Sequence, residues 1–356
     1  MNLKEKIDNL PKTPGIYMMK DKYGDVIYVG KSKKLKERVK SYFVNSKNHS
    51  RKVKRMVKNI EDLDVILTDT ELDALILECE MIKKIRPMYN QLLKNHENYS
   101  YIKINKNIKY PYIEVSKEIE DDSLYFGPYT MDKKLDEIVS IISREYKTRT
   151  CKIMNKCIKY DLNKCIGPCR EIVSKEDYNI IIDTIIKDLN NSNKNLINIL
   201  NKKMQDEISK LNFEKAKDIN NDIVLLKSLS HKQDIINNAN ENKPILAWIN
   251  LDDENIKIYV IKGAKLLKSE LIKVEDFELD NLIYTIKEQI LRNEENIAEE
   301  VVDKYYIDFA NILYSYIKSN KDINYKYIYD KKLVSIKAYL IWFIKFFILV
   351  IIWGFL

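Results

Sequence analysis

The 356-residue sequence contains only three histidines, and its first fifteen residues, MNLKEKIDNLPKTPG, include no apolar run of the kind that forms a signal peptide. The polar start argues against a secretory leader, so we expect a cytoplasmic protein. With so little histidine, acid–base chemistry would have to use other side chains, and the chain offers 24 tyrosines. Its length predicts two or more domains, each with a core of its own.

Acidic residues are nearly absent from one long stretch of the chain. Between Lys31 and Lys58 there are twelve Lys or Arg and a single acid, Glu37, whereas the whole chain has 61 Lys and Arg against 53 Asp and Glu. Such a stretch attracts phosphate groups, because binding releases counterions from a polyanion. It predicts a polyanionic partner, although a merely solvated basic helix face has the same charge pattern.

The sequence GIYMMKDKYGDVIYV, residues 15–29, predicts a β-hairpin whose turn contains KDKYGD. A basic helix is expected next, with Ser32 as its cap and with Arg38 and Tyr42 as neighbours one turn apart. A second basic helix is expected to open at Ser50. The sequence DVILT then predicts a third strand, so the beginning of the chain combines a small sheet with helices.

The sequence TDTELDALILECEMIKKIRP predicts a longer helix with a capping box from Thr68 to Glu71. Glu78 lies beside the apolar stripe of this helix, where a carboxylate needs a partner. A salt bridge at the edge of the core would satisfy it, and so would a bound cation. Cys79, on the same helix, is expected to be a small core residue.

These residues together resemble the GIY-YIG nucleases. The resemblance consists of GIY at 15–17 and YVG at 28–30, followed in order by Lys31, Arg38, Tyr42, Glu78 and Asn90. The phrases PKTPGIYMM and ELDALILECEMIKKIRPMYN are similar to one branch, the UvrC subunits of the bacterial UvrABC excision nuclease. The resemblance implies an α+β fold that begins with a GIY-YIG domain, a small antiparallel sheet with flanking helices, over residues 1–95.

The resemblance also implies a metal-dependent endodeoxyribonuclease. Tyr28 would be the general base, although a free tyrosine titrates at about 10 and needs help from nearby cations. Lys31 and Arg38 would stabilise the anionic transition state, and Glu78 would bind one Mg²⁺ or Mn²⁺. The hydroxyls of Tyr17 and Tyr42 would position water and phosphate, and Asn90 would brace the site. The residues predicted to contact DNA are Lys33, Lys34, Lys36, Lys40, Arg51, Lys52, Lys54 and Arg55. Taken singly, Tyr17 and Tyr28 could also be ordinary strand aromatics.

Four of the five cysteines fall within nineteen residues, but without the paired CxxC knuckles of a zinc ribbon. Their spacing is C-x5-C-x7-C-x3-C, and the residues are Cys151, Cys157, Cys165 and Cys169. In a reducing compartment such a group suggests metal ligation, and the spacing leaves a [4Fe–4S] cluster, a zinc ion and unligated thiols open. The resemblance to UvrC favours a structural iron–sulfur cluster, in a cysteine-rich helical region expected over residues 96–190.

Residues 195–230 predict two amphipathic helices that meet around residues 211–213. A hairpin this short buries little surface by itself, so it should dock on a partner, unless it is an internal helical pair of a larger domain. It resembles the UVR motif, which implies that it binds UvrB. The residues predicted to contact UvrB are Leu211, Phe213, Ala216 and Ile219.

The last part of the sequence alternates in a way that predicts antiparallel strands from residue 245, with a turn near Gly263. This β-rich segment, expected over 245–337, resembles the start of the region that links the two halves of UvrC and is incomplete. Residues 338–356 are nearly all apolar and long enough to span a membrane, so they are either a membrane anchor or the product of a frameshift.

The resemblance therefore implies the N-terminal half of a UvrC-type excision nuclease. It would cut a phosphodiester 3′ of a lesion in double-stranded DNA together with UvrB, and the RNase H-like domain that makes the 5′ incision would be missing. We expect no small-molecule substrate. The alternatives are a catalytically silent adaptor that binds UvrB and DNA, a truncated product without function, and a stand-alone GIY-YIG repair endonuclease.

Overall fold

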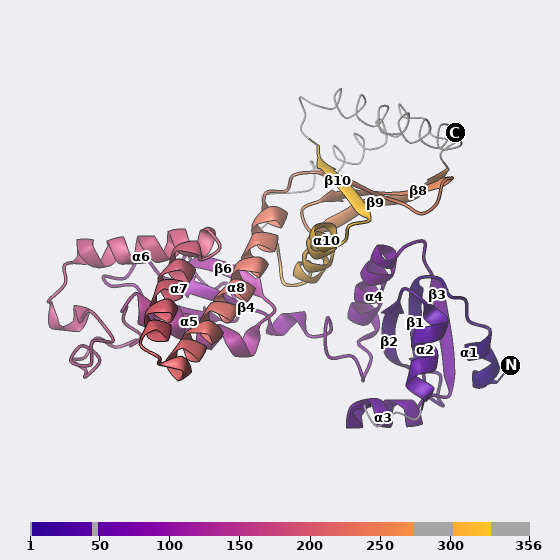
Figure 1. Ribbon diagram of the computed structural model, residues 1–356, viewed down its shortest axis with the longest axis horizontal. Coiled ribbons are helices and arrows are strands. Elements are labelled where there is room, and N and C mark those ends of the chain that lie inside the picture. Colours follow the sequence, from indigo (N-terminus) through magenta and orange to yellow (C-terminus); the bar gives the residue numbers. More distant parts are fainter. Residues whose placement is uncertain (1, 45–48, 274–301, 329–356) are drawn as a thin grey trace. The chain divides into compact units, whose positions relative to one another are not determined.

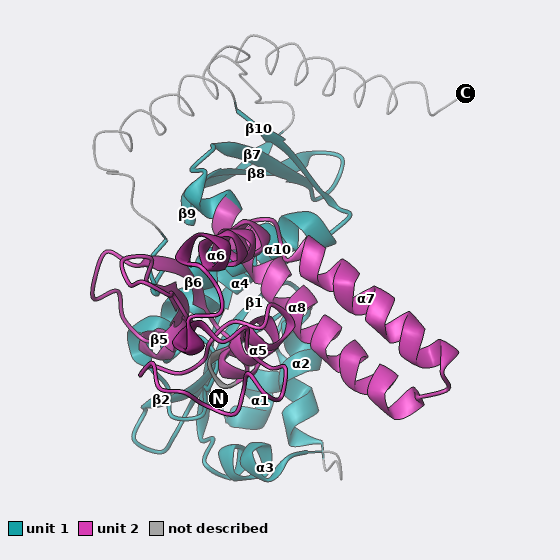
Figure 2. Ribbon diagram, turned by 90° about the vertical axis from the view of Figure 1, so that its left-hand side faces the viewer, with its two compact units in different colours: residues 1–95, 238–356 teal, residues 96–237 magenta. Residues whose placement is uncertain are grey.

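The computed structural model of the chain describes residues 2–44, 49–273 and 302–328 (Figure 1). Contacts between residues divide the chain into two compact units, one of residues 1–95 with 238–356 and one of residues 96–237 (Figure 2). The apolar segment 338–356 lies outside the described residues. Within the described part, no helix is both long and apolar enough to cross a membrane.

The first unit begins with a three-stranded sheet and four helices. Its strand order is β2-β1-β3, and both pairings are antiparallel, which confirms the expected small antiparallel sheet with flanking helices. In this register Tyr17 lies opposite Gly30, and Met19 lies opposite Tyr28. The elements are α1 (Leu3–Asp8), β1 (Gly15–Lys20), β2 (Val26–Ser32), α2 (Leu35–Phe43), α3 (Arg51–Lys58), β3 (Asp62–Leu67) and α4 (Glu71–Ile85).

Two glycines allow this sheet to pack closely. A Cβ atom at Gly30 would lie 2.4 Å from the hydroxyl oxygen of Tyr17, and one at Gly15 would lie 2.4 Å from the carbonyl oxygen of Ile66. Any other residue would force these neighbours apart. The first and last glycines of the GIY and YVG sequences therefore have a packing role, and the ring of Tyr17 lies directly against the backbone of β2.

Helix α4 begins with a capping box two residues later than predicted. Thr70 is the N-cap, its side chain accepts a hydrogen bond from the backbone N–H of Asp73, and the Asp73 carboxylate accepts one from the N–H of Thr70. The predicted box from Thr68 to Glu71 is therefore wrong. A threonine and an acid three residues apart occur twice in TDTELD, and only the second pair is in register with the helix. The correction leaves the Glu71 carboxylate available for other contacts.

The cap of α2 also differs from the prediction, whereas the cap of α3 does not. Lys34 is the N-cap residue of α2, and Ser32 instead accepts a hydrogen bond from the backbone N–H of Lys34 at 2.9 Å, before the helix starts. Ser32 is still part of β2, so it cannot also occupy the first non-helical position. Ser50 caps α3 as expected, by accepting from the N–H of Val53.

The second unit combines a small sheet with helices. Its strands pair in the order β5-β4-β6, all antiparallel, so the region expected to be cysteine-rich and helical also contains a sheet. Strands β4 and β6 are buried on both faces along most of their length, so their residues show little alternation between apolar and polar. The elements are β4 (Ser100–Ile104), β5 (Ile113–Ser116), β6 (Leu124–Tyr129), α5 (Asp132–Glu145), the 3₁₀ turn η2 (Pro168–Arg170), α6 (Lys175–Asn190), α7 (Lys194–Ser209) and α8 (Phe213–Asn240).

Helices α7 and α8 are consecutive and are joined by a turn at residues 210–212, near the position where two helices were expected to meet. Helix α8 continues to Asn240, well past the predicted end at residue 230. Beyond it, residues 245–273 and 302–327 form a sheet of order β10-β7-β8-β9 with one helix, and the expected turn lies at Gly263, whose φ is 58°. The elements are β7 (Ile245–Asn250), β8 (Asn255–Lys262), β9 (Lys265–Lys273), α10 (Ile307–Ser319) and β10 (Ile323–Tyr327).

Candidate active site

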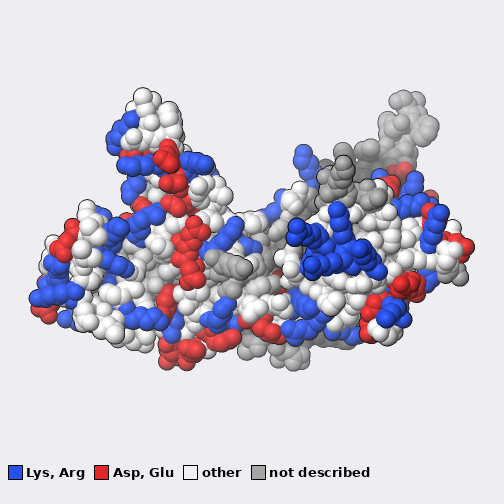
Figure 3. Space-filling model, turned by 90° about the horizontal axis from the view of Figure 1, so that it is seen from below, with Lys and Arg blue, Asp and Glu red and all other residues white. Residues whose placement is uncertain are grey.

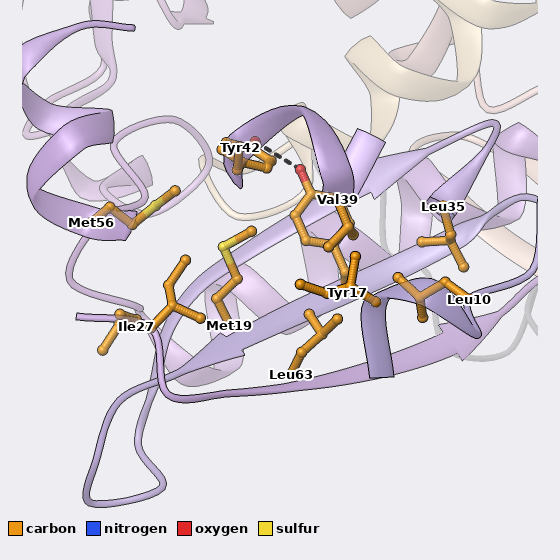
Figure 4. Packing of buried hydrophobic residues seen from close by; sticks show 11 residues of the cluster. Leu10, Tyr17, Met19, Ile27, Leu35, Val39, Tyr42, Met56 and Leu63 are labelled. Carbon is orange, nitrogen blue, oxygen red and sulfur yellow. Dashed lines mark hydrogen bonds between the residues drawn. The ribbon is translucent and has the colours of Figure 1, made fainter. Parts of the chain in front are cut away.

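Three tyrosines from β1, β2 and α2 meet on one side of the first sheet. The ring centroids of Tyr17, Tyr28 and Tyr42 are 6.0 to 6.2 Å apart. Tyr17 is fully buried, and its hydroxyl oxygen lies 2.8 Å from that of Tyr42 (Figure 4). The guanidinium carbon of Arg38 lies 5.1 Å from the ring centroid of Tyr42, as their spacing on a helix predicted. The hairpin and α2 thus bring four of the predicted site residues together.

Tyr28 is half-buried, and its pKa is raised above the ordinary value for tyrosine. Burial is the largest cause, followed by Tyr42 and by the negative charge of Glu78. Arg38 acts in the opposite direction but does not outweigh them. At neutral pH the phenol is therefore protonated in the molecule described here. It could act as a base only where additional positive charge favours the phenolate.

Glu78 projects from α4 toward β2, the strand that carries Tyr28. Its Oε1 accepts a hydrogen bond of 3.0 Å from the backbone N–H of Lys31, and burial raises the pKa of its carboxyl despite this bond and despite the charges of Lys31 and Arg38. The salt bridge considered from the sequence is not found, since no Lys, Arg or His side chain among the described residues pairs with Glu78. Its negative charge is thus only partly compensated.

Glu78 suits a hard divalent cation. A carboxylate oxygen is the ligand that Mg²⁺ and Mn²⁺ prefer, and these ions keep several waters when a site offers one carboxylate. Within the described residues there is no group of three or more His, Cys, Asp or Glu that could hold a metal ion. A cation at Glu78 would take this carboxylate as a ligand and complete its coordination shell with water.

Asn90 connects the chain after α4 to the middle of β2. Its side-chain oxygen accepts from the N–H of Val29 at 2.9 Å, and its side-chain nitrogen donates to the carbonyl of Val29 at 2.9 Å. Both ends of the amide are occupied, so Asn90 fixes the backbone next to Tyr28. This arrangement fits the predicted bracing role.

The ammonium group of Lys31 is turned toward Glu71, at the start of α4. Its Nζ lies 2.5 Å from one carboxylate oxygen of Glu71, and the Nζ of Lys33 lies 2.8 Å from the other. Glu71 and Glu78 are seven residues apart on α4, so they share one face at a separation of about 10 Å along the axis. Sequence reasoning missed Glu71, and its spacing from Glu78 was the signal that could have found it.

The basic residues predicted to contact DNA form two sets. Before and within α2, three of the lysines are paired with acids: Lys33 with Glu71, Lys34 with Glu37 at 4.0 Å and Lys40 with Asp8 at 2.7 Å. The other five, which make no ion pair with another described residue, are Lys36, Arg51, Lys52, Lys54 and Arg55. Four of these five lie on α3. Figure 3 shows a dense group of Lys and Arg side chains on the face seen from below, the side on which α3 lies in Figure 1.

The four cysteines of the second unit lie near one another but do not form a ligand set. Burial is the main cause that raises the pKa of Cys165, and its neighbours Cys151, Cys169 and Cys157 add to the rise. Their thiols are thus within electrostatic range, yet no three of them are placed to hold a metal ion. The iron–sulfur cluster gains no support from this geometry and stays a prediction.

The turn of the α7–α8 hairpin exposes two of the four residues predicted to contact a partner. The side chains of Leu211 and Phe213 are 73% and 63% exposed, whereas Ala216 is buried and Ile219 is half-buried. Leu211 and Phe213 are therefore open for contact. Ala216 packs inside the unit, so a direct contact of this residue with a partner is not available in this structure.

The antiparallel sheet with its tyrosines, Arg38 and Glu78 defines a GIY-YIG domain, and residues 13–91 match the family model of the UvrC-like GIY-YIG domain. Residues 99–188 match the model of the UvrC/Cho excinuclease middle domain. Residues 13–91 and 99–188 therefore carry domains of the UvrC family.

Individual relatives agree with this assignment. The chain is 37% identical over 335 residues to UvrABC system protein C of Clostridioides difficile, covering 90% of this chain and 55% of that protein. For the protein of the same name from Alkaliphilus oremlandii the identity is 36%, with coverages of 90% and 54%. The chain thus spans about half the length of the curated relatives it matches.

The chain is also similar to a solved structure, the GIY-YIG N-terminal endonuclease domain of UvrC from Thermotoga maritima bound to its catalytic divalent cation magnesium. The two are 40% identical, the match covers 25% of this chain and 94% of that chain, and the TM-score is 0.23.

Proposed function

We propose that this chain is a metal-dependent DNA endonuclease of nucleotide excision repair, which hydrolyses a phosphodiester bond 3′ of a lesion. The observation that carries this proposal is the juxtaposition of a partly buried carboxylate, Glu78, with three converging tyrosines and Arg38. Phosphodiester hydrolysis needs a base for water, positive charge for the transition state and a stabilised leaving group, and this group of residues can serve the first two directly.

Each residue then has a task that follows from its position. Arg38, held against the ring of Tyr42, supplies a permanent positive charge to the phosphate. Tyr42 is oriented by its hydrogen bond with Tyr17, and Tyr28 accepts the proton of the attacking water. A divalent cation held by Glu78 would supply Lewis-acid charge for the phosphate oxygens and favour the phenolate form of Tyr28. Without such charge, burial keeps the pKa of Tyr28 too high for a base at neutral pH.

The partners that we propose are UvrB and damaged double-stranded DNA. The relatives are named UvrABC system protein C, and the exposed side chains of Leu211 and Phe213 give the α7–α8 hairpin an apolar tip for a protein partner. The unpaired basic side chains on α3 suit a phosphate backbone, because lysine and arginine bind phosphates with little dependence on sequence.

The nuclease proposal is tested with the full chain, UvrB, Mg²⁺ and a duplex that carries one bulky adduct. We expect a nick 3′ of the adduct, and loss of the nick when EDTA replaces Mg²⁺. Glu78→Gln should reduce the rate roughly a thousandfold, the cost of losing a major electrostatic group at a reaction centre. Glu80→Gln, with the same charge change on the same helix, should cut like the wild type. Equal rates for both variants would contradict the assignment of Glu78.

The iron–sulfur cluster remains part of the proposal and needs its own measurement. Chain purified without oxygen should contain about four iron and four sulfide per molecule if the four cysteines hold a [4Fe–4S] cluster. About one zinc per molecule would identify a zinc site instead. Absence of both metals would leave the cysteines as free thiols.

A further inference from the structure

The carboxylate of Glu71 occupies a place that suits a phosphate. Each of its two oxygens carries one lysine ammonium, Lys31 at 2.5 Å and Lys33 at 2.8 Å. These two lysines outweigh the effect of burial and hold the pKa of Glu71 below its ordinary value. Carboxylates and phosphates bind ammonium groups through the same charge-assisted hydrogen bonds. The pair of lysines is therefore a formed anion-binding site that an acid of the chain itself now fills.

The position of Lys31 connects this site with the reaction centre. Its backbone N–H is bonded to Glu78, whereas its side chain reaches Glu71, about two helical turns away along α4. The ammonium predicted to stabilise the transition state is thus neutralised and directed away from Glu78. Lysine has a flexible four-carbon stem, so rotation of the side chain could carry the charge toward the centre without movement of the backbone.

We propose that Glu71 is an internal substitute for a DNA phosphate, which holds Lys31 and Lys33 in the DNA-free chain and releases them to the backbone phosphates of bound DNA. The inference rests on the proposed function, because it takes DNA as the ligand. Its consequence is that Lys31 becomes available to the reaction only after DNA has displaced Glu71. The contact restrains the site until the substrate is in place.

The exposure of the ion pairs shows that this exchange is feasible. The Lys31, Lys33 and Glu71 side chains are 30%, 66% and 15% exposed, and ion pairs that water reaches are weak enough to open when another anion arrives. The pair between Lys83 and Asp308 in the same unit is different, with exposures of 1% and 4%. Separating that pair would leave buried charges without partners. The position of Glu71 therefore suits a reversible contact.

The test measures DNA binding by the full chain in EDTA, where no metal-dependent cleavage interferes. A fluorescent duplex is titrated with the wild type, Glu71→Gln and Glu80→Gln, and the dissociation constants come from fluorescence anisotropy. Glu71→Gln should bind about three- to tenfold more tightly than the wild type, the range that two released, partly exposed ion pairs allow. Glu80→Gln makes the same charge change in a residue without an ion pair to another described residue, and should change affinity less than about twofold.

The same substitution in a chain with Lys31→Met and Lys33→Met separates the lysines from a general charge effect. In that background Glu71→Gln should no longer tighten binding, because there are no ammonium groups left to release. Circular dichroism of each variant checks that it is folded. Equal affinities of the Glu71→Gln and Glu80→Gln chains would overturn the inference, and so would an undiminished gain in the chain without the two lysines.

The result also distinguishes this inference from the nuclease proposal. If Glu71→Gln tightens DNA binding but the wild type never nicks a damaged duplex, the exchange stands and the nuclease proposal fails. If the wild type nicks and Glu71→Gln binds like Glu80→Gln, the nuclease stands and the exchange is wrong.

Discussion

In helix α4, two glutamates, one at its start and one in its middle, have negative charges that are compensated in opposite ways. At its start, Glu71 has an ammonium on each oxygen, and the pKa of its carboxyl lies below the ordinary value. Two turns later, Glu78 has one backbone N–H as its partner among the described residues, and burial holds its pKa above that value. Both carboxylates contact Lys31, one through its side chain and the other through its backbone. What separates them is how the negative charge is compensated.

This difference separates a structural contact from a reactive one. A compensated carboxylate stabilises the fold and attracts no further cation, whereas a partly buried carboxylate without a cationic side chain costs stability and attracts positive charge. Glu78 also raises the pKa of Tyr28, so its charge acts directly on the proposed base. Reactive chemistry is therefore expected at Glu78, in the middle of α4, and exchange of ligands at Glu71, at its start.

After the effect already given for Glu78→Gln, the next largest effect concerns the proposed base beside Glu78. Tyr28→Phe keeps the ring and removes the hydroxyl, so the fold should persist while the rate of DNA cleavage falls about a hundredfold, as for loss of a general base. Because the pKa of Tyr28 is raised, the wild-type rate should increase with pH through the neutral and mildly alkaline range. The rate of the variant should be nearly independent of pH, as measured by initial rates of nicking at saturating Mg²⁺.

Tyr23→Phe is the matched control, since Tyr23 belongs to the turn of the same hairpin and is 77% exposed. It should cut like the wild type at every pH. A Tyr28→Phe chain that retains the pH dependence of the wild type would assign the proton transfer to another group. The contrast between Glu71 and Glu78 would then have no consequence for catalysis.

The parts of the site that follow from local spacing could be predicted from the sequence. Arg38 and Tyr42 are one helical turn apart, and the hairpin residues follow the alternation of strands, so their neighbourhood was expected. The pairing of Lys31 with Glu71 could not be predicted in this way, because it joins residues forty positions apart whose side chains meet only after α4 has packed on β2. Helix starts were also uncertain, since TDTELD offers two capping boxes and the packing selects one. The sheet of the second unit was missed because β4 and β6 are buried on both faces, so their residues show little alternation.

A second prediction tests whether the candidate active site around Glu78 depends on the close packing of its tyrosines. Gly30→Ala would place a methyl group 2.4 Å from the hydroxyl oxygen of Tyr17. Relief of this overlap should lower the free energy of unfolding by about 1 to 3 kcal/mol, as for other overpacked cores, and should disturb the hydrogen bond between Tyr17 and Tyr42. Urea denaturation measures the loss.

The control for Gly30→Ala is the same substitution in a Tyr17→Ala chain. With the ring gone, the added methyl group has room, so the cost of Gly30→Ala should largely disappear in the double variant. An equal cost in both backgrounds would show that Gly30 is required for its backbone and not for the approach of Tyr17. The close approach of Tyr17 to β2 would then contribute little to the stability of the site.

The smallest effect is the one that compares the two carboxylates directly. The pKa of Glu78 is raised in the folded chain, so protonation of this carboxyl favours the folded state. Its contribution to the free energy of unfolding is fully present below the ordinary pKa of 4.5 and is lost as pH rises through the folded pKa. The pKa of Glu71 is lowered, so its contribution is present above 4.5 and is lost as pH falls through the folded value.

At pH 7 and without divalent cation, Glu78→Gln should therefore raise the free energy of unfolding and Glu71→Gln should lower it, each by up to about 1 kcal/mol. Urea denaturation in EDTA at pH 7 and near pH 4 measures both, and the two differences should shrink at the lower pH because both carboxyls move toward the protonated form. Changes of the same sign at pH 7 would mean that compensation by the lysines does not distinguish Glu71 from Glu78.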